Sequence, residues 1–593
     1  MKRTLVAILC AALLLTGCGS DPIDTAPGNE TEGSSSANTS AVSMDTADLF
    51  TDRDYETGYS ESDCTILTLN GASVIGSGAD IDGATVTITE PGDYLLRGTL
   101  DDGQIIVDVE KTEKVRLILA DAAIASSTSA PIYVRQADKV FITLDGDNTL
   151  TNGGSFEAID DNNIDAVIFS KEDLTLNGAG SLTIVSPAGH GIVSKDELTV
   201  TGGSYDISCA SHAVCGKDNL CIAGGSFTIA AGKDGLRAAH DEDTTLGFLY
   251  IADGTFTIAA EGDGIAASGS MEISGGIYDI TTGGGSENGT QQTSGGWGQM
   301  GGGRGGFGGG MGGPGMSFGG ESTESEDSTS IKGIKAAGDL TIHGGTFTLD
   351  CADDAVHSNT NVTIHGGSFT IATGDDGFHA DETLTITNGT FDISESYEGL
   401  EGLHVLISGG DIRLISSDDG INAAGGTDSS GMGGRDQFGP GGMGGGMSAN
   451  SDGSIIISGG SIYMEASGDG IDANGYLEIT GGYTVVTGPT QGDTATLDYD
   501  TTATISGGTF IGTGASGMAQ TFSGNTQGII AVSLGGSAPA GTELVLTDAA
   551  GKEVVSFTPG LSYAVVILST PDMVSGETYT ISVGTATGEF EAY

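Results

Sequence analysis

The fold of this chain is decided by residues 341–423, where one phrase is written four times. The copies read TIHGGTFTLDCADDAVHS (341–358), TIHGGSFTIATGDDGFHA (363–380), TITNGTFDISESYEGLEG (385–402) and LISGGDIRLISSDDGINA (406–423). Their Gly-Gly or Asn-Gly pairs begin at positions 344, 366, 388 and 409, so successive units are 22, 22 and 21 residues apart. A period of this length indicates a solenoid, in which each unit buries its apolar face against the next.

Apolar and polar residues alternate within each unit, as at Leu384 and Ile386 and again at Phe391 and Ile393. Alternation with period two is typical of β-strands. Short strands separated by glycine corners predict an all-β fold, a right-handed parallel β-helix whose coils of ~22 residues stack about 4.8 Å apart. We expect an N-terminal cap and a small C-terminal β module at its two ends, because uncovered end coils would expose unpaired backbone.

The repeat places acidic residues in columns along the outside of the solenoid. One column holds Asp354, Asp376, Glu398 and Asp419, a partial column beside it holds Asp353, Asp375 and Asp418, and a third holds His357, His379, Glu401 and Asn422. Neighbouring carboxylates about 4.8 Å apart repel by roughly 3 kcal/mol at an effective dielectric near 20. A cation is therefore expected along these columns.

Calcium suits the columns, since it accepts about six to eight oxygen ligands in flexible geometry, whereas the histidines do not suit it. The predicted calcium ligands are Asp353, Asp354, Asp375, Asp376, Glu398, Glu401, Asp418, Asp419 and Asn422. The alternative is that an Asp-Gly pair only forms a good corner, because Asp caps its own turn and Gly accepts positive φ. We prefer this alternative for the isolated corners at Asp234, Asp263 and Asp469.

The chain begins with MKRTLVAILCAALLLTGC, in which Lys2 and Arg3 precede a short apolar stretch. This pattern is typical of a secretory signal and is too short for a membrane-spanning helix. Its Leu-Thr-Gly-Cys ending resembles the bacterial lipobox, so we expect residues 1–18 to be a signal peptide and Cys18 to carry a lipid. Residues 19–48 are expected to be a disordered tether. The protein is then expected on the extracellular side of a bacterial cell membrane, held by its lipid anchor.

Changes in composition divide the rest of the chain. Residues 49–148 are expected to form the N-terminal cap and irregular first coils, 149–517 the parallel β-helix, and 518–593 the C-terminal β module. Two Gly/Met-rich inserts, 283–330 and 425–452, interrupt the repeat and are expected to be disordered. Both flank the acidic columns, which indicates a functional edge, because insertions in solenoids gather on the binding face.

The net charge excludes one class of partner. The chain has 80 acidic and 20 basic residues and a net charge of −60, which would repel the phosphates of nucleic acid. Such a surface attracts cations, and through shared cations it can hold anionic polymers. We expect the protein to be a monomer.

Several stretches occur together in this chain. They are the lipobox, IDGATVTITEPGDYLLRGTL (81–100), SAPIYVRQADKVFITL (129–144), the Asp-Gly corners, SYEGLEG (396–402), and the tail from LTDAAGKEVVSFTPG (546–560) to GETYTI (576–581). Together they resemble a bacterial family of carbohydrate-binding β-helix proteins that is similar in fold to pectate lyases. The resemblance implies calcium sites on the helix and binding of cellulose or of acidic, pectin-like polysaccharide.

Three functions remain open from the sequence. The first is a cell-surface carbohydrate-binding lipoprotein in which bound Ca²⁺ links the acidic columns to sugar carboxylates. The second is a calcium-dependent polysaccharide (pectate) lyase, which needs a basic residue to take the α-proton of a uronate. Lys335, one coil before His357 in the same column, is the candidate base. The third is a surface adhesin or spacer without sugar specificity.

Overall fold

The computed structural model describes residues 49–240, 242–243, 245–289, 330–424, 452–490, 492 and 494–593. The expected signal peptide, Cys18, the tether and most of both Gly/Met-rich inserts lie outside the described residues. The chain divides into two units, Met1–Asp45 and Thr46–Tyr593. The fold and the site described below belong to the second unit.

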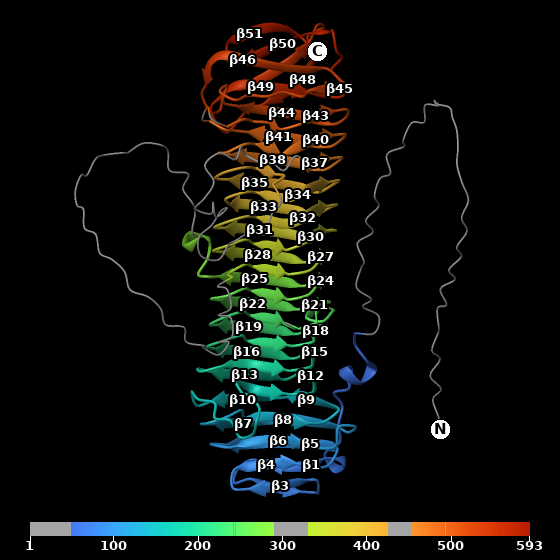
Figure 1. Ribbon diagram of the computed structural model, residues 1–593, viewed down its shortest axis with the longest axis vertical. Coiled ribbons are helices and arrows are strands. Elements are labelled where there is room, and N and C mark those ends of the chain that lie inside the picture. Colours follow the sequence, from blue (N-terminus) through green and yellow to red (C-terminus); the bar gives the residue numbers. More distant parts are fainter. Residues whose placement is uncertain are drawn as a thin grey trace, which may run out of the picture. The chain divides into compact units, whose positions relative to one another are not determined.

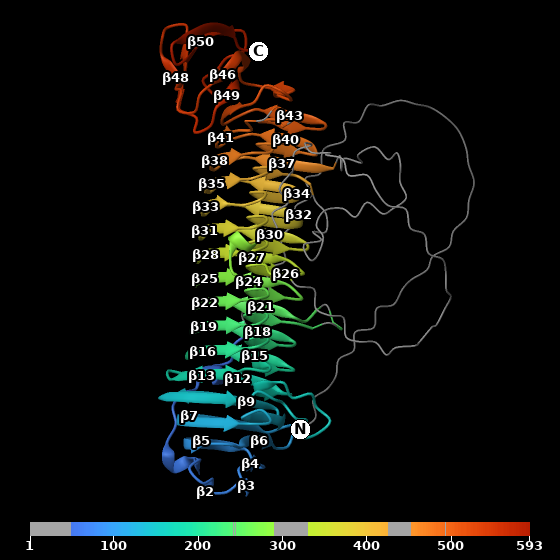
Figure 2. The ribbon, with the colours of Figure 1, turned by 90° about the vertical axis from the view of Figure 1, so that its left-hand side faces the viewer.

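The second unit is all-β, as predicted, and most of its strands belong to one long sheet in which parallel pairing dominates. Through most of the unit each strand pairs with the strand three further along the chain, so that β13 pairs with β16 and β16 with β19. The pairs therefore follow one another in three stacks, whose strands lie one above another in two views at right angles (Figures 1 and 2).

The first stack consists of β1 (Thr65–Thr68), β5 (Gly92–Leu100), β7 (Lys114–Ser126), β9 (Lys139–Asp145), β12 (Asp173–Gly178), β15 (Glu197–Val200), β18 (Asn219–Ile222), β21 (Phe248–Ile251), β24 (Met271–Ile273), β27 (Leu340–Ile342), β30 (Asn361–Ile364), β32 (Phe378–Ile386), β34 (Leu400–Ile407), β37 (Gly453–Ile457), β40 (Gly475–Ile479), β43 (Thr502–Ile505) and β45 (Gly524–Asn525). The long strands β5 and β7 continue into the second stack, and β32 and β34 begin in the third.

The second stack continues with β10 (Asp147–Asn152), β13 (Ser181–Ser186), β16 (Ser204–Cys209), β19 (Ser226–Ala231), β22 (Thr255–Ala260), β25 (Ile277–Thr282), β28 (Thr346–Cys351), β31 (Ser368–Thr373), β33 (Thr390–Glu395), β35 (Asp411–Ser416), β38 (Ser461–Ala466), β41 (Tyr483–Thr487) and β44 (Thr509–Gly514). The third stack consists of β4 (Thr85–Ile88), β6 (Gln104–Asp108), β8 (Ile132–Gln136), β11 (Ala166–Ser170), β14 (His190–Ser194), β17 (Val214–Gly216), β20 (Leu236–Ala238), β23 (Ile265–Ala267), β26 (Ile334–Ala336), β29 (Val356–Ser358), the first parts of β32 and β34, β36 (Ile421–Asn422), β39 (Ile471–Ala473) and β42 (Asp498–Tyr499).

The two ends of the unit depart from this pattern. At the start are four short elements, the 3₁₀ turns η1 (Asp52–Tyr55) and η2 (Glu61–Asp63) and the antiparallel strands β2 (Ser73–Ile75) and β3 (Ala79–Asp82). A further turn, η3 (Ser286–Asn288), follows β25. At the other end β44 pairs antiparallel with β49 (Tyr563–Ser569), which pairs with β46 (Ile529–Ala538). A separate four-stranded sheet contains β47 (Leu544–Asp548), β48 (Glu553–Phe557), β50 (Thr578–Val583) and β51 (Ala586–Glu591).

Alternation within the second stack builds the core. In β22, Phe256, Ile258 and Ala260 are buried while the residues between them are exposed. Aromatic rings from successive units form a column in this core, stacked with centroids 4.6–5.1 Å apart; its members are Tyr205, Phe227, Phe256, Tyr278, Phe347, Phe369 and Phe391. One apolar column therefore links seven consecutive units.

The glycine pairs mark the corner between the first and second stacks. Gly345 has φ +123°, and a Cβ there would lie 3.0 Å from the ring of Phe347. Gly367 repeats this arrangement with φ +116° against Phe369. The glycine is required because the backbone turns in the left-handed region and passes directly over the aromatic column.

Candidate cation site at the acidic corner

The predicted acidic column lies where the chain passes from the second stack to the third. Here a side chain of one unit accepts a hydrogen bond from the backbone N–H at the same position of the next unit. The N–H of Asp376 donates to Asp354 Oδ1 (3.0 Å), and the N–H of Glu398 donates to Asp376 Oδ1 (3.1 Å). We call this column the corner ladder; such bonds join three runs of successive positions, namely His190, His212, Asp234, Asp263 and Lys332, then Asp354, Asp376 and Glu398, then Asp419, Asp469 and Ala495.

The ladder gives its carboxylates a structural role, because each accepted bond satisfies a backbone donor at a buried turn. The alternative interpretation expected a structural role for Asp, but its mechanism differs from the observed one: the bonds go to the next unit rather than to the residue's own turn, and Gly377 and Gly420, which follow Asp376 and Asp419, do not have positive φ. The contact usually engages Oδ1 of the aspartate. The charge of the carboxylate and its second oxygen must then be matched by another group.

At Asp234 the matching group is basic. Its Oδ2 lies 3.1 Å from Arg237 Nη1 and 3.0 Å from His212 Nδ1, while its Oδ1 accepts the N–H of Asp263. Burial would raise the pKa of Asp234, but the bond with His212 and the charges of His212 and Arg237 lower it below its ordinary value. This corner is balanced by the chain itself.

A buried lysine balances the corner formed by Asp353 and Asp354. Lys332 Nζ donates to Asp354 Oδ2 (2.6 Å) and to Asp353 Oδ1 (3.1 Å), and the lysine side chain is only 3% exposed. Burial would raise the pKa of Asp354, but the charge of Lys332 and the bond with His357 hold it below its ordinary value. Burial and the charge of Asp354 raise the pKa of Asp353 to about 6. The ammonium group of Lys332 thus lies between the two carboxylates, where the sequence predicted a calcium ion.

The next corner is organised around a buried histidine. His379 Nδ1 lies 3.2 Å from Asp376 Oδ2 and 2.7 Å from Glu401 Oε2, and its Nε2 lies 3.3 Å from Asp381 Oδ1. Burial would lower the pKa of His379, but its bonds with these three carboxylates raise it well above its ordinary value. These contacts favour the protonated imidazole, which is the basic group that faces the carboxylates of this corner.

His357 stacks on His379 with ring centroids 4.8 Å apart. Its Nδ1 contacts Asp354 Oδ2 (2.8 Å) and its Nε2 contacts Asn359 Oδ1 (3.0 Å). Burial and the charge of Lys332 lower the pKa of His357. The two stacked rings therefore differ in charge, since one has a lysine beside it and the other has carboxylates.

The next two corners, formed around Glu398 and Asp419, hold more negative charge. Asn422 Nδ2 donates to both carboxylate oxygens of Glu398 (3.1 and 3.0 Å), yet burial and the charges of Glu401 and Asp419 raise the pKa of Glu398 well above its ordinary value. Burial and the charges of Asp418 and Asp469 raise the pKa of Asp419 to about 8. Within the described parts of the chain, Asp419 forms no ion pair with Lys, Arg or His.

Asp419 belongs to a cluster of three carboxylates from two units that are adjacent in space. Oxygens of Asp419, Asp469 and Asp472 all lie within 4.8 Å of one another, and the N–H of Asp469 donates to Asp419 Oδ1 at 2.6 Å. Burial and the charges of Asp469 and Asp498 raise the pKa of Asp472 to about 7. Burial is the main cause of both raised pKa values, and the charges of neighbouring carboxylates add to it.

Four groups of potential metal ligands lie in this region, and their chemistry differs. The groups are Asp353/Asp354/Asp375, Asp354/His357/His379, Asp376/His379/Glu401 and Asp419/Asp469/Asp472. The first already holds a lysine, and the next two contain imidazole, which calcium does not favour. The last offers oxygen donors alone. Calcium–oxygen distances of about 2.3–2.6 Å place opposite ligands about 5 Å apart, so this donor set fits calcium.

The candidate base Lys335 lies in the predicted column, paired in register with His357. Its Nζ donates to Ser330 Oγ (2.9 Å), and Ser330 Oγ donates to Asp263 Oδ1 (2.7 Å). Lys335 also acts electrostatically on Asp263, whose pKa is nevertheless raised by burial and by Asp234. Its contacts thus link it to the corner ladder.

The structure assembles the predicted columns and adds residues that the sequence interpretation left out. His357 and His379 were placed in register but set aside as poor calcium ligands, whereas they are members of the buried charge network. Asp472 was missed because it follows the second insert. The spacing within the repeat could have identified Asp472, because it lies three residues after Asp469, just as His357 lies three residues after Asp354.

Part of the chain is similar to a known protein family. Residues 82–377 match the family model described as "Carbohydrate-binding domain-containing protein". A carbohydrate-binding domain-containing protein of Acetivibrio thermocellus is 40% identical over 134 residues, which are 22% of this chain and 47% of the relative. The chain thus spans about half the length of the curated relative that it matches.

A solved structure of a polysaccharide lyase-like protein from C. thermocellum, a gadolinium derivative, is 34% identical in sequence. The match covers 37% of this chain and 91% of that protein, with a TM-score of 0.36. In the described residues, no helix is both long enough and apolar enough to span a membrane.

Proposed function

We propose that this protein is a cell-surface lipoprotein that binds polysaccharide through calcium held at the acidic corner, with Asp419, Asp469 and Asp472 as the central ligands. The carbohydrate-binding family of residues 82–377 supports the substrate class. The observation that carries the proposal is the charge at Asp419. Asp234, Asp354 and Asp376 each lie within 3.2 Å of a basic side chain, whereas Asp419 forms no ion pair with a basic side chain among the described residues and has oxygens of Asp469 and Asp472 within 4.8 Å.

The protein's own residues would orient the ion from one side. Asp419 is held by the N–H of Asp469 through Oδ1, so its position is fixed by the backbone before any ion arrives. The neighbouring Asp418 and Asn422 are further oxygen donors of the same unit. Calcium bound there would offer its remaining coordination positions to carboxylate or hydroxyl oxygens of a sugar. Acidic, pectin-like polysaccharide is the preferred partner, and cellulose is the second.

The proposal includes the surrounding architecture. We infer that the three stacks close as a right-handed parallel β-helix, because each unit supplies one strand to every stack and the apolar column of rings runs through consecutive units. We also infer a lipid anchor on Cys18 at the extracellular side of the membrane, from the lipobox. Incorporation of labelled fatty acid that persists in Cys18→Ser would exclude this anchor.

Retention on polysaccharide tests the binding function. Wild-type protein should be retained by polygalacturonate in calcium and released by EDTA, and insoluble cellulose tests the second partner. The variant Asp419→Asn/Asp472→Asn keeps the side-chain volume and the ladder acceptor but removes two charges, so its calcium-dependent retention should fall at least tenfold.

Asp392→Asn, an exposed change on β33, is the matched control and should bind as the wild type does. Retention that EDTA does not affect would remove calcium from the mechanism. If neither polymer retains the protein in calcium, the proposed function is wrong.

A further inference from the structure

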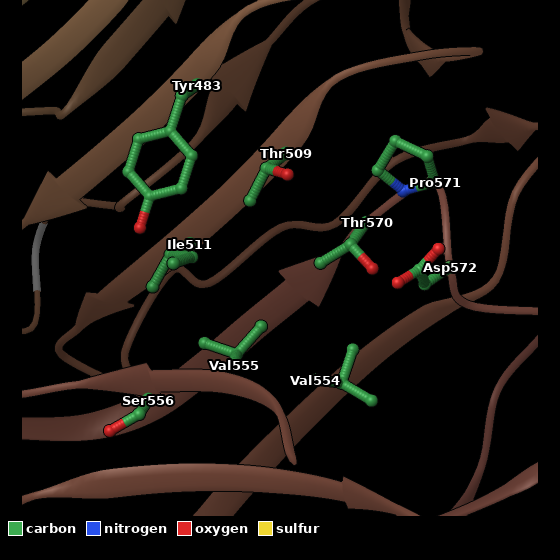
Figure 3. Close-up of a pocket in the computed structure, with 9 residues that line it drawn as sticks. All are labelled: Tyr483, Thr509, Ile511, Val554, Val555, Ser556, Thr570, Pro571 and Asp572. Atoms are coloured by element: carbon green, nitrogen blue, oxygen red, sulfur yellow. The ribbon is translucent and has the colours of Figure 1, made fainter. Parts of the chain in front are cut away.

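The groups of potential metal ligands in the described residues lie at the acidic corner. The pocket between the end of the second stack and the C-terminal sheet (Figure 3) contains none of these groups, because Asp572 is the single acidic, histidine or cysteine residue among the nine that line it. Calcium suits the oxygen donors around Asp419. The group of Asp376, His379 and Glu401 includes an imidazole and therefore favours a different ion.

Three potential ligand atoms from two adjacent units converge at this group. His379 Nδ1 lies 3.2 Å from Asp376 Oδ2 and 2.7 Å from Glu401 Oε2, and the ligand oxygens of the two carboxylates lie within 4.8 Å of each other. Tetrahedral zinc, with bonds of about 2.0–2.2 Å, places neighbouring ligand atoms about 3.3 Å apart. Side-chain adjustments alone would let the three atoms meet one zinc ion, and its fourth position would stay open.

The other ring nitrogen of His379 is already anchored. Its Nε2 lies 3.3 Å from Asp381 Oδ1, and an ionised carboxylate accepts a hydrogen bond but cannot donate one. The contact thus favours a hydrogen on Nε2 and directs Nδ1 toward Asp376 and Glu401. Histidines that bind metals are typically held in this way, because the nitrogen that does not bind the ion donates to a carboxylate or carbonyl oxygen.

A single proton on Nδ1 satisfies this corner incompletely. A hydrogen bond is strongest along the axis of its N–H group, so a bond directed at Glu401 Oε2 weakens the one to Asp376 Oδ2. In the described parts of the chain, His379 is the basic side chain that forms ion pairs with Asp376, Asp381 and Glu401, so one basic group faces three carboxylates. A zinc ion in place of the proton carries two charges and can bind Nδ1 and two carboxylates at once.

The preceding unit shows the same position balanced without a metal. His357 stacks on His379, and its Nδ1 lies 2.8 Å from Asp354 Oδ2. Lys332 Nζ lies 2.6 Å from the same oxygen and supplies the positive charge there. In register, Glu401 follows His379 as His379 follows His357. The next unit therefore has an additional carboxylate where the preceding one has a basic side chain.

We propose that Asp376, His379 and Glu401 bind one zinc ion, with Asp381 as a positioning residue for the histidine. The ion links two adjacent units and leaves one coordination position for water. This site shares no residue with the cluster around Asp419, so zinc binding does not depend on the proposed calcium-dependent function.

Titration calorimetry of the full chain with zinc tests the proposal, in excess calcium so that sites with oxygen ligands alone are filled. The wild type should bind one zinc ion, and zinc should raise its melting temperature. His379→Gln and Glu401→Gln each remove one ligand and should lower zinc affinity at least about tenfold. Asp381→Ala should also lower the affinity about tenfold, whereas Asp381→Asn keeps the acceptor oxygen and should restore it.

A surface histidine pair provides the matched control. His365 is exposed and stacks on His343 with ring centroids 5.1 Å apart, so His365→Gln should bind zinc as the wild type does. The variant Asp419→Asn/Asp472→Asn should also keep its zinc affinity, which separates this site from the calcium site.

The outcome that overturns the proposal is defined for each variant. No zinc binding by the wild type in calcium, unchanged affinity in Glu401→Gln, or loss of binding in His365→Gln would each overturn it. Glu401→Gln decides the question even if His379→Gln does not fold, because the Glu401 side chain is 15% exposed and that of His379 only 4%. Cobalt in place of zinc should give the visible absorption of a tetrahedral ion, and that absorption should be lost in Glu401→Gln.

Discussion

Replacement of Lys332 by methionine tests the charge balance of the corner ladder. Met keeps the unbranched stem but removes the ammonium group that lies 2.6 Å from Asp354 Oδ2 and 3.1 Å from Asp353 Oδ1. The lysine side chain is 3% exposed and those of the two aspartates are 0% and 9% exposed, so the variant leaves two buried carboxylates without their cation. The expected loss in the free energy of unfolding is about 3–5 kcal/mol, typical of one partner removed from a buried pair.

The backbone contact is unaffected by this change, because the N–H of Lys332 still donates to Asp263 Oδ1. Urea unfolding at pH 7 measures the loss, and amide hydrogen exchange in β29 and β31 shows whether it is local. The double variant Lys332→Met/Asp354→Asn should recover about half of the loss, since Asn keeps the ladder acceptor. Calcium should stabilise Lys332→Met more than it stabilises the wild type, because Asp353, Asp354 and Asp375 then form an open oxygen cluster. A loss below about 1 kcal/mol would refute the reasoning.

Four further outcomes are expected. In EDTA, the free energy of unfolding in urea should fall as pH rises from about 4 to about 8. The reason is that the native pKa values of Asp419 and Asp472, about 8 and about 7, lie above the ordinary value of 3.8. Added calcium should abolish this fall. His379→Gln should cost most below about pH 6.5 and progressively less in alkaline solution, since the raised native pKa of His379 makes its contribution complete only at low pH. Polygalacturonate should yield no ultraviolet-absorbing unsaturated product at alkaline pH; a rise in absorbance that Lys335→Ala abolishes would show a lyase. Deletion of residues 425–452 should leave the calcium-induced rise in melting temperature unchanged, and a folded deletion variant without that rise would place a ligand in the insert.

Much of the fold follows from short-range rules that the sequence displays. Alternation predicts strands, and the spacing of the Gly-Gly pairs sets which residues share a column, so Asp354 and Asp376 are neighbours in the structure as they are in the repeat. The same register places His357 opposite Lys335 and His379. Columns are predictable because each unit repeats one geometry.

The partners within a column are less predictable, because they depend on side-chain direction and protonation. The sequence places Lys332 one unit of 22 residues before Asp354, but it does not show that the lysine ammonium bridges two buried carboxylates. His379 carries a charge because three carboxylates surround it, whereas His357, one unit away, lies beside a lysine and has a lowered pKa. Two histidines at equivalent repeat positions thus differ in charge, and only the positions of their neighbours reveal why.

The candidate calcium site shows that the strand register is maintained across an insert in the repeat. Asp419 and Asp469 are 50 residues apart in sequence, yet β35 pairs with β38 and β36 with β39, so the two residues occupy successive positions of the corner ladder. Removal of the 28 residues 425–452 from that interval leaves 22 residues, the ordinary length of a unit. The insert therefore adds chain at a corner without shifting the strands on either side of it.

The cluster of Asp419, Asp469 and Asp472 is positioned by strand pairing, and the excess of carboxylates arises because two acidic units meet there without a basic side chain against Asp419. The hydrogen bond from the N–H of Asp469 to Asp419 Oδ1 thus also fixes a carboxylate at the proposed calcium site, so a structural role of these aspartates and the proposed calcium binding are compatible.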